Sequence, residues 1–336
     1  MSIEPSHSGQ VLRVALVAPL VYAAAVGLGV TLPFVAPMLF ATLALQLTVL
    51  PPFKNVVLLA LLLVLLPFAF SGVAGVLNQY PYLLVGFVGL VLFHAFRLQA
   101  VPKTAIIGML LQTFAIMLPI ITGAFDLAGE AASHTFATNG VLAVAGIYVA
   151  FALFPADEGA RQVPEPPAAG DALARSRDAA VATLVMLPAF TLLLAFNLIS
   201  AMRVLFTIAI VLTSLNRRDV RATGAERILG TLMAGAVALA ATALFAIWPA
   251  PAAAVVAMAF LGLLVVPHAF RGERRGAVAL AVPMVWVLVG VASESAMSKT
   301  VEWCLYSMIG VLYAIWARAL ILRLLGWARQ PRVLAA

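Results

Sequence analysis

The stretch DEGARQVPEPPAAGDALARSRD, residues 157–178, is the longest polar interruption in a chain of 336 residues. Its three prolines, all between residues 164 and 167, favour an extended backbone, because proline lacks the amide hydrogen that a helix interior needs. Mostly apolar sequence of comparable length flanks the stretch on each side. We therefore expect two membrane halves, residues 1–156 and 179–336, joined by a short tether.

The composition indicates a membrane protein. Apolar residues make up 64% of the chain and charged residues only 10%, whereas a soluble domain carries about 25% charged residues. The single cysteine, Cys304, excludes an intramolecular disulfide. The net charge of +7 is divided among short clusters between apolar runs, which is typical of membrane topology. We expect a lipid bilayer around the chain and no nucleic-acid partner.

The apolar runs predict an all-α, polytopic membrane bundle of about twelve transmembrane helices, because a span needs roughly 17–25 apolar residues. Six predicted spans precede the tether: Val11–Val30, Phe34–Leu50, Asn55–Leu77, Pro81–Phe96, Thr104–Phe125 and Thr138–Phe154. Six follow it: Ala179–Phe196, Leu198–Leu215, Ile228–Trp248, Ala252–Ala269, Ala277–Ala292 and Val301–Leu325.

The positive residues predict the orientation. If both termini and the tether are cytoplasmic, 18 of the 20 Lys and Arg residues lie at cytoplasmic loops or helix ends. Only Arg203 and Lys299 fall on the other side. Cytoplasmic loops of membrane proteins carry such an excess. We therefore expect a multi-pass membrane protein with both termini in the cytoplasm.

A short sequence pattern recurs in the two halves. FVGL at residues 87–90 is followed by HAFR at 94–97, and FLGL at 260–263 is followed by HAFR at 268–271. Both copies fall in the fourth predicted helix of their half. Since each half has an even number of helices, we expect two parallel six-helix repeats related by an axis along the membrane normal.

Three residues are candidates for a proton relay. His94 and His268 end the paired helices, and histidine titrates near neutral pH. The alternative is that both histidines only complement the helix dipole and the lipid headgroups. Asp126, in the outer loop before the sixth helix, is a candidate for the mouth of the path.

Three further polar residues are candidates for substrate contacts. Arg203 lies near the outer end of the eighth helix, where a guanidinium can bind an anion or extend to the headgroups. Gln46 and Gln112 lie at or near membrane depth, where an amide can line a path or join helices. The sequence leaves both alternatives open for each residue.

Motifs of catalysis and nucleotide binding are absent from the sequence. No HExxH, P-loop, GxSxG or CxxC pattern occurs. We expect no enzymatic activity, no metal site and no cofactor. If the chain moves a solute, the energy has to come from an ion gradient.

The segment ERILGTLMAG, residues 226–235, carries the one family resemblance. Arg227, Gly230, Thr231 and Gly235 form an Arg-x-x-Gly-Thr pattern followed by small residues. This pattern and the six-plus-six arrangement resemble the fusaric acid resistance family of aromatic acid exporters. The resemblance implies proton-coupled efflux of small aromatic or weakly acidic compounds across the inner membrane. It also implies a periplasmic membrane-fusion (adaptor) protein as partner.

Two other functions stay open at this point. A transporter of the major facilitator type shares the layout of two six-helix halves, although LPPFK at residues 50–54 does not match that family's loop signature. The other hypothesis is a non-transporting component that anchors or assembles other proteins. The sequence also leaves homo-oligomerisation open.

The orientation is testable with reporter fusions. A reporter fused after Arg161 or Ala336 should report the cytoplasm, and one fused after Glu130 should report the opposite compartment, because the basic residues follow the cytoplasmic side. A cytoplasmic signal at Glu130 would overturn the predicted topology.

Overall fold

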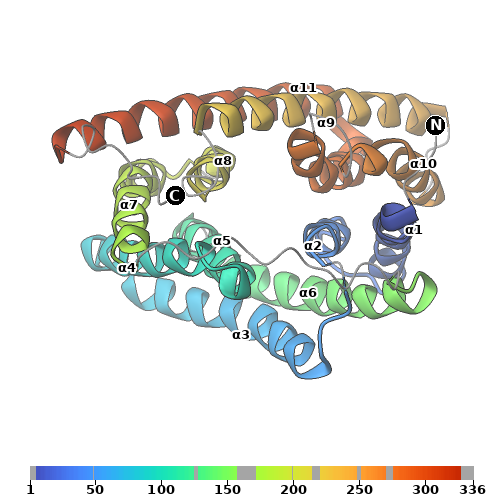
Figure 1. The fold of residues 1–336 in the computed structure, drawn as a ribbon, viewed down its shortest axis with the longest axis horizontal. Helices are drawn as coiled ribbons and strands as arrows, with labels where there is room; N and C mark the ends of the chain where they lie inside the picture. Colours follow the sequence, from blue (N-terminus) through green and yellow to red (C-terminus); the bar gives the residue numbers. More distant parts are fainter. Residues whose placement is uncertain are drawn as a thin grey trace.

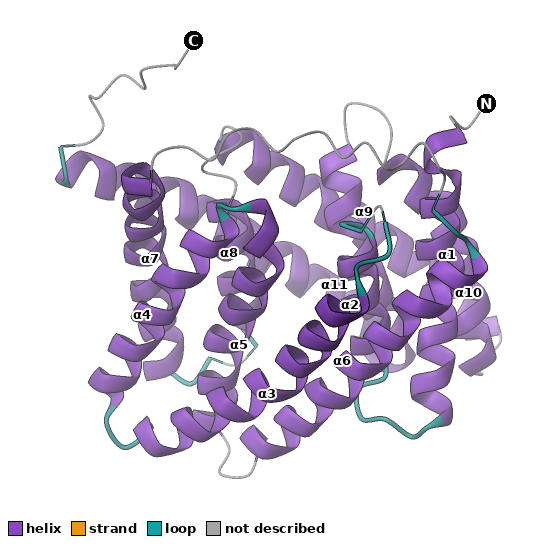
Figure 2. Cartoon of the chain, turned by 60° about the horizontal axis from the view of Figure 1, so that its bottom comes forward, coloured by secondary structure: helices purple, strands orange, loops and turns teal. Residues whose placement is uncertain are grey.

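The computed structural model describes residues 5–47, 49–124, 128–156, 172–198, 200–213, 220–247, 251–269 and 275–326. Helices joined by short loops make up this part of the chain, and no strand occurs in it (Figure 2). The predicted all-α class is therefore confirmed. The tether residues 157–171 and the candidate Asp126 lie outside the described residues.

The first half contains six α-helices and a 3₁₀ turn. They are α1 (Pro5–Gly27), α2 (Val35–Ala44), α3 (Phe53–Leu77), α4 (Pro81–Gln99), η1 (Pro102–Thr104), α5 (Ala105–Ala124) and α6 (Ala128–Leu153). Two of these helices differ most from the prediction. The second span is a helix of only 10 residues, about 15 Å long, which is too short to cross a membrane alone. The sixth begins ten residues earlier than predicted, inside the segment expected to be an outer loop.

The second half contains five α-helices in its described residues. They are α7 (Ala172–Ala195), α8 (Met202–Thr213), α9 (Val220–Ile247), α10 (Pro251–Ala269) and α11 (Arg275–Leu324). Helix α7 starts within the predicted tether, and α8, with 12 residues, is short like α2.

The predicted break between the last two spans is absent. Helix α11 runs unbroken for 50 residues through both of them. The sequence VASESAMSKT at residues 291–300 is polar, which predicted a loop, but it contains neither glycine nor proline. Nothing in it therefore breaks the helical hydrogen bonding. The structure has eleven α-helices in the described residues rather than twelve, and the five of the second half do not confirm the predicted pair of six-helix repeats.

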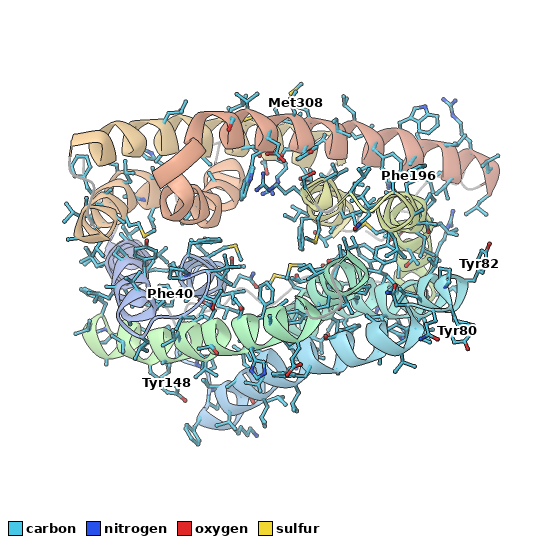
Figure 3. The ribbon with its side chains drawn as sticks, turned by 180° about the vertical axis from the view of Figure 1, so that it is seen from behind. Phe40, Tyr80, Tyr82, Tyr148, Phe196 and Met308 are labelled. Carbon is cyan, nitrogen blue, oxygen red and sulfur yellow. The ribbon has the colours of Figure 1, made fainter. Side chains whose placement is uncertain are left out.

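Among the described residues, eight helices are long and apolar enough to cross a membrane. They indicate a multi-pass membrane protein. Exposed aromatic side chains at helix ends agree with this conclusion, since tyrosine and tryptophan gather at membrane–water interfaces. Figure 3 shows Tyr80, Tyr82 and Phe196 at one end of the bundle, and Tyr82 is 92% exposed. Phe40, by contrast, is fully buried.

The two halves interlock. Helix α4 of the first half packs on α7 of the second, and α10 of the second half packs on α1 of the first (Figure 1). Along the two long edges, α9 lies beside α11, and α3 lies beside α5 and α6. The apolar clusters cross the boundary too: Val88 and Leu92 pack with Val185 and Phe190. The halves thus form one bundle rather than two separate bodies.

Side-chain hydrogen bonds hold the short helix α2. The side-chain oxygen of Asn139, a fully buried residue of α6, accepts the backbone N–H of Ala36 at 3.0 Å. Its amide nitrogen donates to the carbonyl of Thr31 at 3.1 Å. One asparagine therefore caps α2 and fixes the loop that precedes it.

Glycine allows α4 and α5 to approach closely. A Cβ atom built at Gly108 of α5 would lie 2.5 Å from the carbonyl oxygen of Ala95 and 2.8 Å from the backbone nitrogen of Gln99. Backbone atoms cannot move aside as a flexible side chain can. At Gly86 of α4 a Cβ would meet nothing within 4 Å.

These two glycines give a matched test. We expect Gly108→Ala to destabilise the protein by about 1–3 kcal/mol, because the methyl group has to displace the α4 backbone. Gly86→Ala should be neutral or stabilising by up to about 1 kcal/mol, because alanine favours helix. Thermal unfolding of both variants in detergent checks this. Equal stability would mean that α4 and α5 are not in close contact.

Candidate functional site

Arg203 lies in the first turn of α8 and contacts two consecutive residues of α11. Its Nη1 atom is 4.0 Å from Oε1 of Glu302. Its Cζ atom lies 4.1 Å from the centre of the Trp303 ring, a cation–π contact. Glu302 and Trp303 both belong to α11. A guanidinium with these two neighbours binds a substrate anion less strongly than a free one. The role of Arg203 as a substrate contact stays a prediction.

Gln46 contacts α5, and Gln112 belongs to it. The Nε2 atom of Gln46, an exposed residue after α2, lies 4.0 Å from the sulfur of Met109. Gln112 follows Met109 by one turn and is only 4% exposed. Its Oε1 atom accepts a hydrogen bond from Nε2 of Gln99 at 2.7 Å, and its own Nε2 has no hydrogen-bond partner in the described structure. Their predicted substrate contact remains untested.

The proton-relay candidates are not joined in the described part of the structure. His94 and His268 are both exposed, near the C-terminal ends of α4 and α10. No described carboxylate forms an ion pair with either ring. Asp126 lies outside the described residues. The relay stays a prediction.

The four residues of the family pattern are buried together in α9: Arg227, Gly230, Thr231 and Gly235. The hydroxyl group of Thr231 lies 2.9 Å from the carbonyl oxygen of Arg227 and donates to it. It also lies 3.3 Å from the hydroxyl of Ser307 on α11. Thr231 therefore lies at the contact of α9 with α11.

Thr223 is a residue that the sequence reasoning missed. It precedes Arg227 by one helical turn, and it is 5% exposed. Its hydroxyl has no hydrogen-bond partner in the described part of the protein. The signal was present, because Thr223, Arg227 and Thr231 are spaced by four residues and so share one face of a helix. The small-residue pattern that starts at Thr231 simply extends two turns toward the N-terminus.

The buried charges have one sign. Arg13 and Arg227, 4% and 7% exposed, are buried, whereas no Asp or Glu is buried among the side chains that the structure describes. Arg13 donates from Nε to the carbonyl of Gly9 at 3.2 Å, and its Cζ lies 4.2 Å from the Phe151 ring centre. For Arg227 the Nε atom is buried with no described partner. The buried charged residues among the described side chains are thus both arginines.

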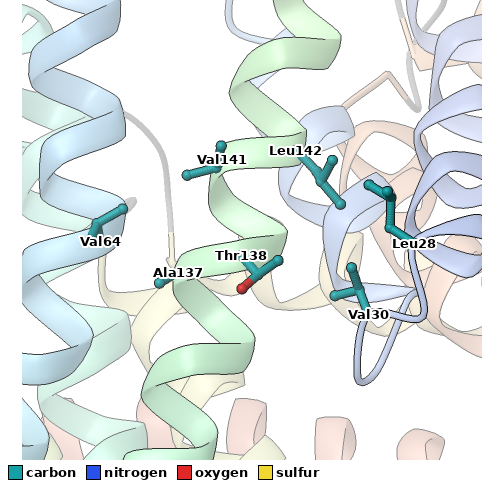
Figure 4. A pocket seen from close by; sticks show the side chains of 7 residues that line it. All are labelled: Leu28, Val30, Val64, Ala137, Thr138, Val141 and Leu142. Carbon is teal, nitrogen blue, oxygen red and sulfur yellow. The ribbon is translucent and has the colours of Figure 1, made fainter.

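A shallow groove of about 390 Å³ opens between α3, α6 and the loop that follows α1 (Figure 4). Its lining is apolar except for one threonine: Leu28, Val30, Val64, Ala137, Thr138, Val141 and Leu142. It offers no charged group to an ionic ligand. A lipid-facing hollow is its simplest description.

No cluster of His, Cys, Asp or Glu suited to a metal ion occurs within the described ranges. Comparisons with protein-family models, curated proteins and solved structures give no match for this chain. The fold and the buried residues therefore define the class: a multi-pass helical membrane protein whose described interior holds arginine without acidic residues.

The Arg203–Glu302 contact is testable by a double-mutant cycle. We expect Arg203→Gln and Glu302→Gln each to destabilise the protein by no more than about 1 kcal/mol, because both side chains are partly exposed. The double variant should cost less than the sum of the two, since each single change removes the same contact. Thermal unfolding checks the cycle. Strict additivity would show that the two residues do not interact.

Proposed function

We propose that this chain is an inner-membrane efflux transporter subunit that exports small aromatic or weakly acidic compounds and is coupled to protons. The observation that carries the proposal is the sign of the buried charge. A buried cation is costly in a membrane protein, and such residues usually lie on a solute path or pair with an opposite charge. Arginine without buried acid favours a solute that is itself an anion.

The arrangement of the helices supports a transporter built from two repeats. In each half a long helix with an internal proline, Pro19 in α1 or Pro188 in α7, precedes a short helix, α2 or α8. The fourth helices, α4 and α10, both start at a proline and both have 19 residues. Reciprocal packing of α4 on α7 and of α10 on α1 fits a twofold axis between the halves. Transporters use such axes to move one half against the other.

The Arg-x-x-Gly-Thr pattern of α9 supports a relationship to the fusaric acid resistance exporters. Its residues are buried, and Thr231 lies at the α9–α11 contact, as expected of a pattern that specifies packing. A member of that family would export through a periplasmic adaptor protein. The same relationship favours the inner membrane and cytoplasmic termini.

The test is an efflux assay in cells that lack the gene. We expect these cells to accumulate radiolabelled benzoate and 4-hydroxybenzoate several-fold above cells that carry the gene on a plasmid. A protonophore should abolish the difference, because the proton gradient supplies the energy.

Neutral benzyl alcohol serves as the control solute, since it crosses membranes without a carrier. Its accumulation should not depend on the gene. If the gene changes the accumulation of none of the acids, the transport proposal is wrong and a non-transporting role in membrane assembly is favoured.

A further inference from the structure

One face of α9 carries three polar residues at intervals of four: Thr223, Arg227 and Thr231. All three are buried, being 5%, 7% and 2% exposed. Their hydrogen bonding differs. Thr231 is satisfied by the Arg227 carbonyl and by Ser307, whereas the Thr223 hydroxyl and the Arg227 Nε have no described partner. Two hydrogen-bonding groups thus remain unused one turn apart.

The surrounding contacts fix where this face lies. A Cβ built at Gly224 would be 2.7 Å from Cγ1 of Val311, so α9 and α11 are in close contact beside Thr223. The Thr231–Ser307 hydrogen bond joins the same two helices two turns further along. Arg227 is located between these two contacts. Its position is therefore determined by packing on both sides, not by a flexible loop.

An arginine in this setting needs an anion. Removing a charged group from water costs several kcal/mol unless a partner compensates. Arg203 has a carboxylate and an aromatic ring, and Arg13 has an aromatic ring and a carbonyl. Arg227 has neither a carboxylate nor an aromatic ring in contact among the described side chains.

We propose that Arg227 and Thr223 form an oxyanion-binding subsite, and that it takes the carboxylate of the exported compound. The proposal rests on the proposed function for the identity of the solute. The guanidinium offers parallel N–H donors that match the two oxygens of a carboxylate, and the threonine hydroxyl, one turn away, adds another donor. The phosphate of a lipid headgroup has the same oxyanion chemistry and is the other source of a ligand.

The subsite explains a difference between the halves. In the proposed repeat, the third helix of the first half, α3, corresponds to α9. There the segment KNVVL, residues 54–58, stands where α9 has the Arg-x-x-Gly-Thr pattern. The first half therefore carries no arginine at the equivalent place. One anion subsite in a bundle of two halves suits a path with a single substrate orientation.

The experiment measures ligand-induced thermal stabilisation of the purified full-length chain in lipid nanodiscs. The probes are benzoate and its neutral isostere benzamide. The variants are Arg227→Gln, Arg227→Lys and Thr223→Val, and Arg323→Gln in the exposed last turn of α11 is the matched control. Nanodiscs of zwitterionic phosphatidylcholine, alone or with net anionic phosphatidylglycerol, test whether an anionic lipid headgroup binds Arg227 in place of benzoate.

We expect benzoate, but not benzamide, to raise the unfolding temperature of the wild type and of the Arg323→Gln control. Arg227→Gln should weaken benzoate binding by about tenfold to hundredfold, the usual effect of losing a charged hydrogen bond. Arg227→Lys should fall in between, because an ammonium group lacks the planar fork. Thr223→Val should weaken binding by a few-fold. Without ligand, Arg227→Gln should be at least as stable as the wild type, because it removes an uncompensated buried charge.

Equal stabilisation of the wild type and Arg227→Gln by benzoate would overturn the subsite. Stabilisation by phosphatidylglycerol that depends on Arg227, with no response to benzoate, would keep the oxyanion site but reject the substrate carboxylate. If Arg227→Gln is less stable than the wild type without ligand, Arg227 has a structural role, and Thr223→Val becomes the deciding variant. Benzoate binding by Thr223→Val that equals that of the wild type would then overturn the proposal. Since binding is measured without transport, a failure of export in cells leaves this result standing, and the two proposals fail separately.

Discussion

Inside a membrane, every backbone N–H and C=O group has to find its partner within the protein, and this constraint governs the bundle. Long helices satisfy it on their own. The short helices α2 and α8 are too short to cross a membrane alone, and polar groups at their starts contact longer helices. Asn139 of α6 caps the start of α2 and ties down the preceding loop. Ser133 of the same helix donates to the carbonyl of Pro67, the proline within α3, at 3.0 Å.

The start of α8 uses different chemistry at a comparable place. There Arg203 stands between Glu302 and Trp303 of α11, the helix that runs beside α8 as α6 runs beside α2. Tyr313 of α11 also donates to the carbonyl of Val185 in α7 at 2.9 Å, near Pro188. A long helix thus stabilises the irregular points of each half, by an uncharged amide in the first and by an ion pair and a phenol in the second. On the proposed repeat, the halves share a framework and differ in the polar groups placed on it.

The sequence predicted the framework well where local signals were strong. Proline and apolar length located α3, α4 and α10 to within a few residues, because Pro52, Pro81 and Pro251 mark their starts. It failed where an apolar run does not imply a helix of equal length, as in α2 and α8, and where a polar run stays helical, as in α11. Burial was the least predictable property. Arg203 and Arg227 look alike in sequence, yet only the tertiary packing gives Arg203 a carboxylate partner and leaves Arg227 buried without one.

This contrast between two arginines bears on how a membrane bundle separates structural from functional charge. Arg203 is about one-third exposed and lies near a carboxylate and an aromatic ring, so its removal changes little beyond these partly exposed contacts. Arg227 is packed between two fixed contacts of α9 with α11, and its charge raises the free energy of the empty protein. On the proposed oxyanion subsite, this cost is offset when an anion binds. The same guanidinium is then unfavourable without a ligand and favourable with one, which on this proposal couples anion binding to the packing of α9 on α11.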